Sequence, residues 1–285
     1  MFPLDKLHQR QNKTNSLLCI GLDPDFSKIS AQFSKLKFPQ FEFNKLIIEQ
    51  THEYALAYKP NTAFYEARGS QGWKELEMTM EYLHKNHPDI FTIADAKRGD
   101  IGSTNQGYVT AIFDHLGFDA VTIHPFTGSE GLSPFLERQD KVSIVLCHTS
   151  NPGAKELQEM RLQTELANDD GIPLSTESRD RDDSLLLWQI IAEKVVNDWN
   201  KNKNCMLVVG ATFPEELKKV REIVGDMWLL IPGIGSQGGD LDAVLENGLT
   251  AKKDGVLINA SRSIIFAESP KDEAENLVRQ MQKLL

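Results

Sequence analysis

Apolar residues along this chain gather in eight short runs, and longer segments with apolar residues three or four positions apart separate most of these runs. Short apolar runs predict buried strands, and the spacing of three and four predicts helices with one apolar face. The predicted strands are residues 16–23, 54–61, 90–97, 119–125, 141–150, 205–212, 227–235 and 254–263. The clearest predicted helices are residues 72–86, 108–117, 184–199, 213–225 and 271–285.

The alternation of strand and helix predicts an α/β fold with parallel strands, because parallel neighbours need a crossover connection. Eight such units fit a closed (β/α)8 TIM barrel. A doubly wound open sheet is the alternative, but it usually carries a GxGxxG turn after the first strand, where this chain reads GLDPDF at 21–26. No linker rich in Pro, Gly or Ser divides the chain, so residues 1–285 are predicted to form a single domain.

One segment interrupts the alternation of strand and helix. Residues 154–183, which follow the fifth predicted strand, are polar, charged and weakly periodic. Connections between a strand and the next helix typically have about 2 to 6 residues, so this segment is interpreted as an insertion. Two readings stay open, a solvated surface loop and a lid over the C-terminal face of the barrel.

The charge balance restricts the partners of the protein. The chain carries 31 Lys and Arg against 41 Asp and Glu, a formal net charge of −10. A surface of this sign repels phosphodiester backbones and anionic lipid, so neither nucleic acid nor a membrane is an expected partner. An anionic small molecule would need a local cluster of cations and backbone N–H groups.

The three cysteines, Cys19, Cys147 and Cys205, each lie in an apolar run without the spacing of a zinc site. They predict buried free thiols and a reducing compartment. Residues 1–13 lack the apolar stretch of a signal peptide, and no run of about 18 apolar residues occurs. A cytoplasmic location is therefore expected.

Charged residues lie at the C-terminal ends of several predicted strands. In TIM barrels, the catalytic groups lie at the C-terminal ends of the strands. Lys59 follows the second apolar run, Asp23 follows the first, and Asp95 and Lys97 close the third, with Asp100 in the turn beyond. Asp95 and Lys97 are two positions apart, so both side chains should face the barrel interior. A strand-end Asp can instead cap the next helix and a Lys can reach to water, an alternative that is strongest for Asp23.

An array of alternating charges favours one type of chemistry. Lysines close to carboxylates stay protonated, so they are poor Schiff-base nucleophiles but can stabilise and protonate a carbanion. A fixed carboxylate beside them would repel a substrate carboxylate. These groups together predict a decarboxylation. Metal binding by Asp95 or Asp100 ranks lower, because Lys59 and Lys97 already supply positive charge there.

A candidate phosphate site follows the last two predicted strands. Residues 232–239 read PGIGSQGG and residues 259–263 read NASRS, where backbone N–H groups and Arg262 are available to an anion. The loops after the seventh and eighth strands are the frequent phosphate-binding location of TIM barrels. A phosphorylated substrate is therefore predicted.

These motifs together resemble the orotidine 5′-phosphate decarboxylases, in particular their longer bacterial form. The resemblance rests on DAKRGDIGST at 95–104, an LDP at 22–24, KPN at 59–61, TSNPGA at 149–154 and the two phosphate-loop motifs, in family order from the first strand to the last. It implies a TIM barrel that converts orotidine 5′-phosphate to uridine 5′-phosphate and CO2, the last step of pyrimidine nucleotide synthesis, without metal or organic cofactor.

The resemblance also implies roles for single residues. Lys97 would donate a proton to C6 of the pyrimidine, Asp95 would face the departing carboxylate, Lys59 would hold this network and contact the ribose, and Asp23 would bind a ribose hydroxyl. Asp100, Ile101 and Thr104 would reach into the site of a partner subunit, which implies a homodimer with shared active sites. Ser150 would bind the pyrimidine ring, Pro232 would border it, and Gln237 and Arg262 would hold the phosphate.

Two features qualify the resemblance. Shorter family members carry a glycine before the phosphate-binding arginine, where this chain has Ser261. Related barrels with the same DxKxxD signature use a metal-stabilised enediolate, but they place an acidic ligand where this chain has Lys59.

A barrel that binds nucleotides or a protein partner without catalysis is the remaining alternative, although such a protein would not need both lysines and both carboxylates.

Overall fold

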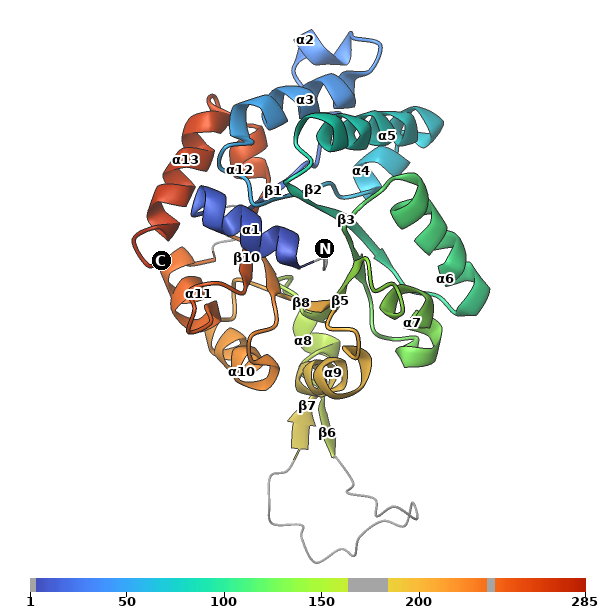
Figure 1. Ribbon diagram of the computed structural model, residues 1–285, viewed down its shortest axis with the longest axis vertical. Coiled ribbons are helices and arrows are strands. Elements are labelled where there is room, and N and C mark those ends of the chain that lie inside the picture. Colours follow the sequence, from blue (N-terminus) through green and yellow to red (C-terminus); the bar gives the residue numbers. More distant parts are fainter. Residues whose placement is uncertain (1–3, 164–183, 235–238) are drawn as a thin grey trace, which may run out of the picture.

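The computed structural model describes residues 4–163, 184–234 and 239–285. Eight parallel strands close into a barrel in the order β1-β10-β9-β8-β5-β4-β3-β2 (Figure 1). The barrel strands are β1 Leu18–Gly21, β2 Ala57–Lys59, β3 Phe91–Arg98, β4 Ala120–Ile123, β5 Val142–His148, β8 Cys205–Val209, β9 Leu229–Pro232 and β10 Val256–Ala260. Each coincides with one of the eight predicted runs, and the predicted TIM barrel is confirmed.

Helices pack around the outside of the barrel and connect its strands (Figure 1). They are α2 Ala31–Ser34, α3 Pro39–Thr51, α4 Ala63–Glu66, α5 Gly69–Asn86, α6 Gly102–Val109, α7 Gly128–Leu136, α9 Leu187–Lys194, α10 Pro214–Val224, α11 Leu241–Gly248, α12 Arg262–Ile265 and α13 Pro270–Met281, with π-helical turns η1 Thr110–His115 and η3 Val195–Trp199. Fully buried apolar side chains fill the space between helices and strands, for example Phe91, Phe118, Phe135 and Trp188. None of the described helices combines the length and apolar character that a membrane span requires.

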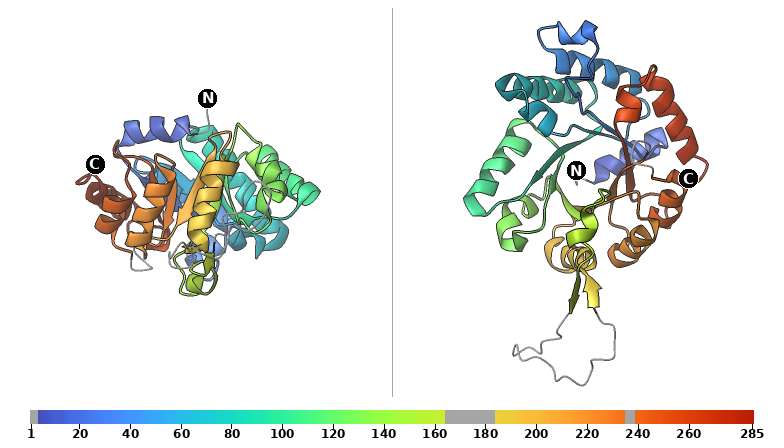
Figure 2. Two further views of the ribbon diagram at one scale, coloured as in Figure 1. Left: turned by 90° about the horizontal axis from the view of Figure 1, so that it is seen from below. Right: turned by 180° about the vertical axis from the view of Figure 1, so that it is seen from behind.

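Opposite ends of the barrel differ in what covers them. Helix α1, Asp5–Thr14, lies across the end where the strands begin, and the described residues between β5 and α9 extend from the other end (Figure 2). This segment contains α8 Ala154–Leu157 and an antiparallel pair, β6 Arg161–Gln163 with β7 Ser184–Leu186, which projects from the barrel (Figure 1). Of the predicted insertion 154–183, residues 164–183 lie outside the described residues.

One predicted helix begins later than expected. Residues 184–186 carry the same apolar pattern as the helix after them, but they form β7. Pairing with β6 decides this, because Leu162 lies opposite Leu185 and the ladder fixes the backbone as extended. Helix α9 therefore starts at Leu187.

The other sequence features of the core agree with expectation. All three cysteines are buried and free, as predicted. Gly21 closes β1 where a side chain could not fit, because a Cβ there would lie 2.6 Å from Oγ of Ser261. This close approach brings the end of β10 against the end of β1 on the side where the predicted charges gather.

Candidate active site

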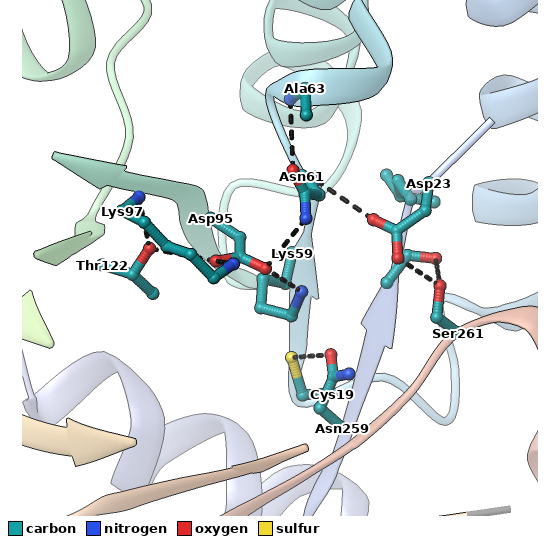
Figure 3. Close-up of polar contacts among 12 residues, drawn as sticks. Cys19, Asp23, Lys59, Asn61, Ala63, Asp95, Lys97, Thr122, Asn259 and Ser261 are labelled. Atoms are coloured by element: carbon teal, nitrogen blue, oxygen red, sulfur yellow. Dashed lines mark hydrogen bonds and ion pairs between the residues drawn. The ribbon is translucent and has the colours of Figure 1, made fainter. Parts of the chain in front are cut away.

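Three of the predicted catalytic side chains meet at the carboxyl ends of β2 and β3 (Figure 3). Lys59, the last residue of β2, is only 4% exposed, and Asp95 from the neighbouring strand is 11% exposed in its side chain. The Lys97 side chain is 49% exposed, so this ammonium group is the accessible end of the array. One carboxylate therefore lies between two lysines.

Asp95 is the centre of this array and contacts both lysines. Its Oδ2 lies 2.9 Å from Nζ of Lys59, and its Oδ1 lies 2.6 Å from Nζ of Lys97. Asn61 Nδ2 donates to Oδ2 at 3.4 Å, and Thr122 Oγ1 donates to Oδ1 at 3.0 Å. Four donors, two for each oxygen, thus fix the orientation of the carboxylate.

The close contacts determine the ionisation of the buried pair. Burial disfavours the ammonium form of Lys59, but the carboxylates of Asp95 and Asp23 outweigh burial and raise its pKa above the ordinary value. Burial also disfavours the charged form of Asp95, but the ammonium groups of Lys59 and Lys97 lower its pKa well below the usual range. Asp95 is therefore a fixed negative charge at neutral pH and Lys59 a fixed positive one.

Asp23 lies beside the array and joins two other strand ends. Its Oδ1 accepts the backbone N–H of Asn61 at 3.1 Å, and its Oδ2 accepts the hydroxyl of Ser261 at 2.5 Å (Figure 3). Ser261 directly precedes Arg262, the first residue of α12. Ser261 stands where shorter family members carry a glycine. Its hydroxyl therefore links the predicted phosphate loop to Asp23, the predicted ribose ligand.

Asp100 does not join the array in the described part of the chain. Its carboxylate accepts the backbone N–H of Ile101 at 2.7 Å, and its backbone atoms bind the side chain of Asn105. Within one subunit, Asp95 therefore contacts Lys59 and Lys97, and the carboxylate of Asp100 makes none of these contacts. Ile101 and Thr104 are exposed beside Asp100, and the Ile101 side chain is 62% exposed although it is apolar.

The other predicted binding residues lie at the same end of the barrel. Ser150 follows β5 and lies against Gly210, where a Cβ would meet the Ser150 backbone at 2.7 Å. Pro232 is the last residue of β9, opposite Asn259 of β10, and Arg262 is exposed at the start of α12. Gln237 lies outside the described residues.

Sequence reasoning gave no role to two residues that contact Asp95. Asn61 stands in the KPN motif, so its place directly after Lys59 was an available signal. Thr122 lies in the middle of an apolar strand, and only the pairing of β4 with β3 reveals its contact. No group of three or more His, Cys, Asp or Glu side chains that could hold a metal ion occurs among the described residues.

Comparison with known proteins agrees with this arrangement. The model of the orotidine 5′-phosphate decarboxylase / HUMPS family matches residues 16–277. The chain is 45% identical to an orotidine 5′-phosphate decarboxylase of Christiangramia forsetii, covering 92% of this chain and 89% of the relative, and 44% identical to that of Flavobacterium johnsoniae, covering 95% and 91%.

Solved structures show the same similarity. The Leishmania donovani OMP decarboxylase superimposes with a TM-score of 0.84 at 38% identity and covers 100% of this chain and 99% of its own. The Toxoplasma gondii structure described as a putative orotidine-monophosphate decarboxylase has a TM-score of 0.85 at 31% identity, over 99% and 95% of the two chains. The chain therefore belongs to the orotidine 5′-phosphate decarboxylase / HUMPS family.

Proposed function

We propose that this chain decarboxylates orotidine 5′-phosphate to uridine 5′-phosphate and CO2, the last step of UMP synthesis, and that it needs no metal ion. The observation that carries the proposal is the contact of Asp95 with both Lys59 and Lys97 at the carboxyl end of the barrel. Relatives named for this activity, with 45% and 44% identity over most of both chains, support it.

The chemistry follows from the fixed charges. The bond between C6 and the substrate carboxylate breaks, CO2 leaves, and the electron pair stays on C6. Lys97 stabilises this carbanion and then transfers an ammonium proton to C6. Asp95 stays ionised because two ammonium groups hold it, so it repels the substrate carboxylate before CO2 departs. Lys59 holds Asp95 in place and binds the ribose.

The remaining predicted residues bind the substrate. Asp23 takes a ribose hydroxyl, Ser150 the pyrimidine ring, and Pro232 borders that ring, while Gln237 and Arg262 hold the phosphate. The hydrogen bond of Ser261 to Asp23 supports this arrangement, because it links the turn that carries Arg262 to the proposed ribose ligand. A bidentate arginine is well suited to a phosphate group.

The alternative reaction of related barrels, which proceeds through a metal-stabilised enediolate, is less well supported. A divalent cation would need carboxylate oxygens, and both oxygens of Asp95 already accept lysine ammonium groups at 2.9 and 2.6 Å. Lys59 also occupies the position where such relatives place an acidic ligand. These contacts favour the metal-free reaction.

The test is ultraviolet monitoring of orotidine 5′-phosphate with purified protein that has been treated with a chelator. We expect full conversion to uridine 5′-phosphate, at a rate that added Mg²⁺ leaves unchanged. Loss of turnover on chelation, with recovery on adding metal, would favour the enediolate reaction. Binding of uridine 5′-phosphate without any turnover would instead favour a barrel without catalytic activity.

We also propose that the chain is a single domain, residues 1–285, that acts in the cytoplasm as a homodimer with shared active sites. The exposure of Ile101 and Thr104 supports this proposal, because residues that reach into the site of a partner subunit must be accessible in the single subunit. Both readings of residues 154–183, a surface loop and a lid, stay open.

Complementation between two inactive variants tests the shared site. Lys97→Ala and Asp100→Ala proteins are mixed, unfolded in mild denaturant and refolded together so that mixed dimers form. Each mixed dimer would contain one site with both substitutions and one site with neither, so activity should recover to about a quarter of the parent level per site, by statistical pairing of the two chains. Mixed dimers that form without any activity would contradict the proposal.

A further inference from the structure

Strands β3 and β4 do not pair regularly where the catalytic residues lie. Ala94 pairs with Val121 and Arg98 pairs with Ile123, so the three residues 95–97 of β3 stand opposite Thr122 alone. Such a bulge removes ladder hydrogen bonds and redirects side chains. Lys97 has a φ of 47°, in the left-handed region that residues other than glycine seldom adopt.

The side chain of Thr122 makes hydrogen bonds where the irregular pairing of β3 and β4 leaves backbone groups without a ladder partner. Its Oγ1 accepts the backbone N–H of Lys97 at 2.9 Å, and the same hydroxyl donates to Oδ1 of Asp95 at 3.0 Å (Figure 3). Thr122 is only 1% exposed, so these contacts are shielded from bulk solvent. One buried hydroxyl thus holds both the backbone of the proposed proton donor and the carboxylate beside it.

The contact also determines which oxygen of Asp95 faces which lysine. Thr122 and Lys97 donate to Oδ1, whereas Lys59 and Asn61 donate to Oδ2. Without the hydroxyl, Oδ1 keeps a single donor from a flexible and half-exposed lysine. The carboxylate could then rotate, and the left-handed backbone of Lys97 would lose its side-chain acceptor.

We propose that Thr122 is a positioning residue that keeps Asp95 and Lys97 in the geometry needed for decarboxylation. This inference rests on the proposed function, because it assigns Thr122 a part in that reaction. Thr122 itself does not react. It acts through the two groups that its hydroxyl contacts, and its removal should affect the reacting state more than the binding of substrate.

The chain offers a closely matched control for this role. Thr92 in β3 is also 1% exposed, accepts the backbone N–H of Asp119 at 3.1 Å and donates to Oδ2 of Asp119 at 2.9 Å. It makes the same two kinds of hydrogen bond as Thr122, but at the opposite end of the barrel. Valine at either position has nearly the shape of threonine and replaces the hydroxyl with a methyl group, so both variants carry the same chemical change.

The experiment compares Thr122→Val, Thr122→Ser and Thr92→Val with the parent enzyme in kcat, KM and melting temperature. We expect Thr122→Val to lower kcat about 10- to 100-fold, the loss that a small misplacement of reacting groups causes, with KM changed by less than about threefold. Thr122→Ser restores the hydroxyl and should recover most of kcat. Thr92→Val should lower the melting temperature by a similar amount to Thr122→Val while keeping the parent kcat.

The result that overturns the inference is a Thr122→Val enzyme with the parent kcat, or one whose loss of kcat is matched by Thr92→Val. Crystal structures of the parent and of Thr122→Val give a second readout that does not depend on turnover. The Asp95 carboxylate and the Lys97 backbone should move in the variant, and unchanged positions would contradict the positioning role. A parent protein without turnover would instead refute the proposed function, which separates the two failures.

Discussion

Two buried cations, Lys59 and Arg10, lie at opposite ends of the barrel and are held in different ways. Lys59 at the end of β2 is 4% exposed and pairs with the carboxylate of Asp95, which in turn binds a second lysine. Arg10 in α1 is 5% exposed and donates to two backbone carbonyl oxygens as well as to the carboxylate of Asp89. Similar burial therefore accompanies two different sets of partners.

The partners indicate what each cation does. The carbonyl groups of Ala55 and His52 that bind Arg10 precede β2, so this guanidinium ties α1 to the barrel and satisfies backbone acceptors. The chain of contacts from Lys59 ends instead at Lys97, whose side chain is 49% exposed. A buried charge that is linked to an accessible one is suited to chemistry, whereas one bound by backbone acceptors stabilises the fold.

A cavity lies at the end of the barrel that α1 covers. A cavity of about 460 Å³ borders Arg10, Lys6 and Lys13 near α1. Its cations are already paired, because Lys6 lies 2.7 Å from Asp119, and Lys13 and Arg10 lie 2.7 and 2.6 Å from Asp89. Arg10 and Lys13 share one carboxylate there, just as Lys59 and Lys97 share Asp95 at the carboxyl end. What distinguishes the carboxyl end is that Ser261 and Arg262, which follow β10, also lie there and supply the predicted phosphate contacts.

The largest effect that this comparison predicts is that of Lys97→Ala. Removing the accessible ammonium group should lower kcat at least about 10³-fold, because a proton donor and a stabilising charge are lost together. The melting temperature and the affinity for uridine 5′-phosphate should stay close to those of the parent, since Lys97 is half exposed. Steady-state kinetics, thermal unfolding and product titration measure the three quantities, and turnover near that of the parent would refute the assigned role.

Arg10→Met should show the opposite pattern. The variant leaves two carbonyl oxygens without their donor, and unsatisfied buried acceptors cost about 1–3 kcal/mol each, so we expect about 2–6 kcal/mol lower free energy of unfolding. Turnover of the folded fraction at 25 °C should be unchanged, because α1 lies at the far end of the barrel (Figure 2). Denaturant unfolding gives the stability, and a kcat that falls with it would show that the two ends are coupled.

Much of the fold was predictable because each barrel strand is a continuous apolar run between polar segments. The same reasoning located Lys59 and Asp95, since a charged residue that closes such a run must lie at the mouth of a barrel. It was wrong at residues 184–186, where helical spacing continues into β7 and only the partner strand decides the structure. Apolar spacing is local, whereas strand pairing is not.

The details of the site were less predictable, for physical reasons. The DxKxxD spacing suggests that Asp100 joins Asp95 and Lys97, but the left-handed backbone at Lys97 redirects the chain and the Asp100 carboxylate binds the adjacent Ile101 N–H. The sequence does not single out Thr122, because threonine is common in strands. Its role follows from the bulge between β3 and β4, which depends on register and leaves no mark in the composition.

The smallest predicted effect is the loss of stability at low pH that the titration of Asp89, the partner of Arg10, should cause. Burial favours the neutral form of Asp89, but the hydrogen bond from Lys13 and the charge and hydrogen bond of Arg10 outweigh it and lower the pKa of Asp89 to about 2. Because this pKa lies below the ordinary value, the carboxylate stabilises the folded state above about pH 4, and this stabilisation is lost as the pH falls from about 4 to 2.

Asp89→Asn tests the sign of this effect. The variant should be less stable than the parent at pH 7, and the difference in free energy of unfolding should shrink as the pH falls to about 2.5. The difference should be modest, since the Asp89 side chain is 44% exposed and solvent screens its ion pairs. Both proteins retain Asp95, so its own titration cancels when urea unfolding is compared at each pH. A difference that is constant from pH 7 to 2.5 would contradict the lowered pKa of Asp89, because a group whose pKa is the same in the folded and unfolded states adds no pH dependence to the stability.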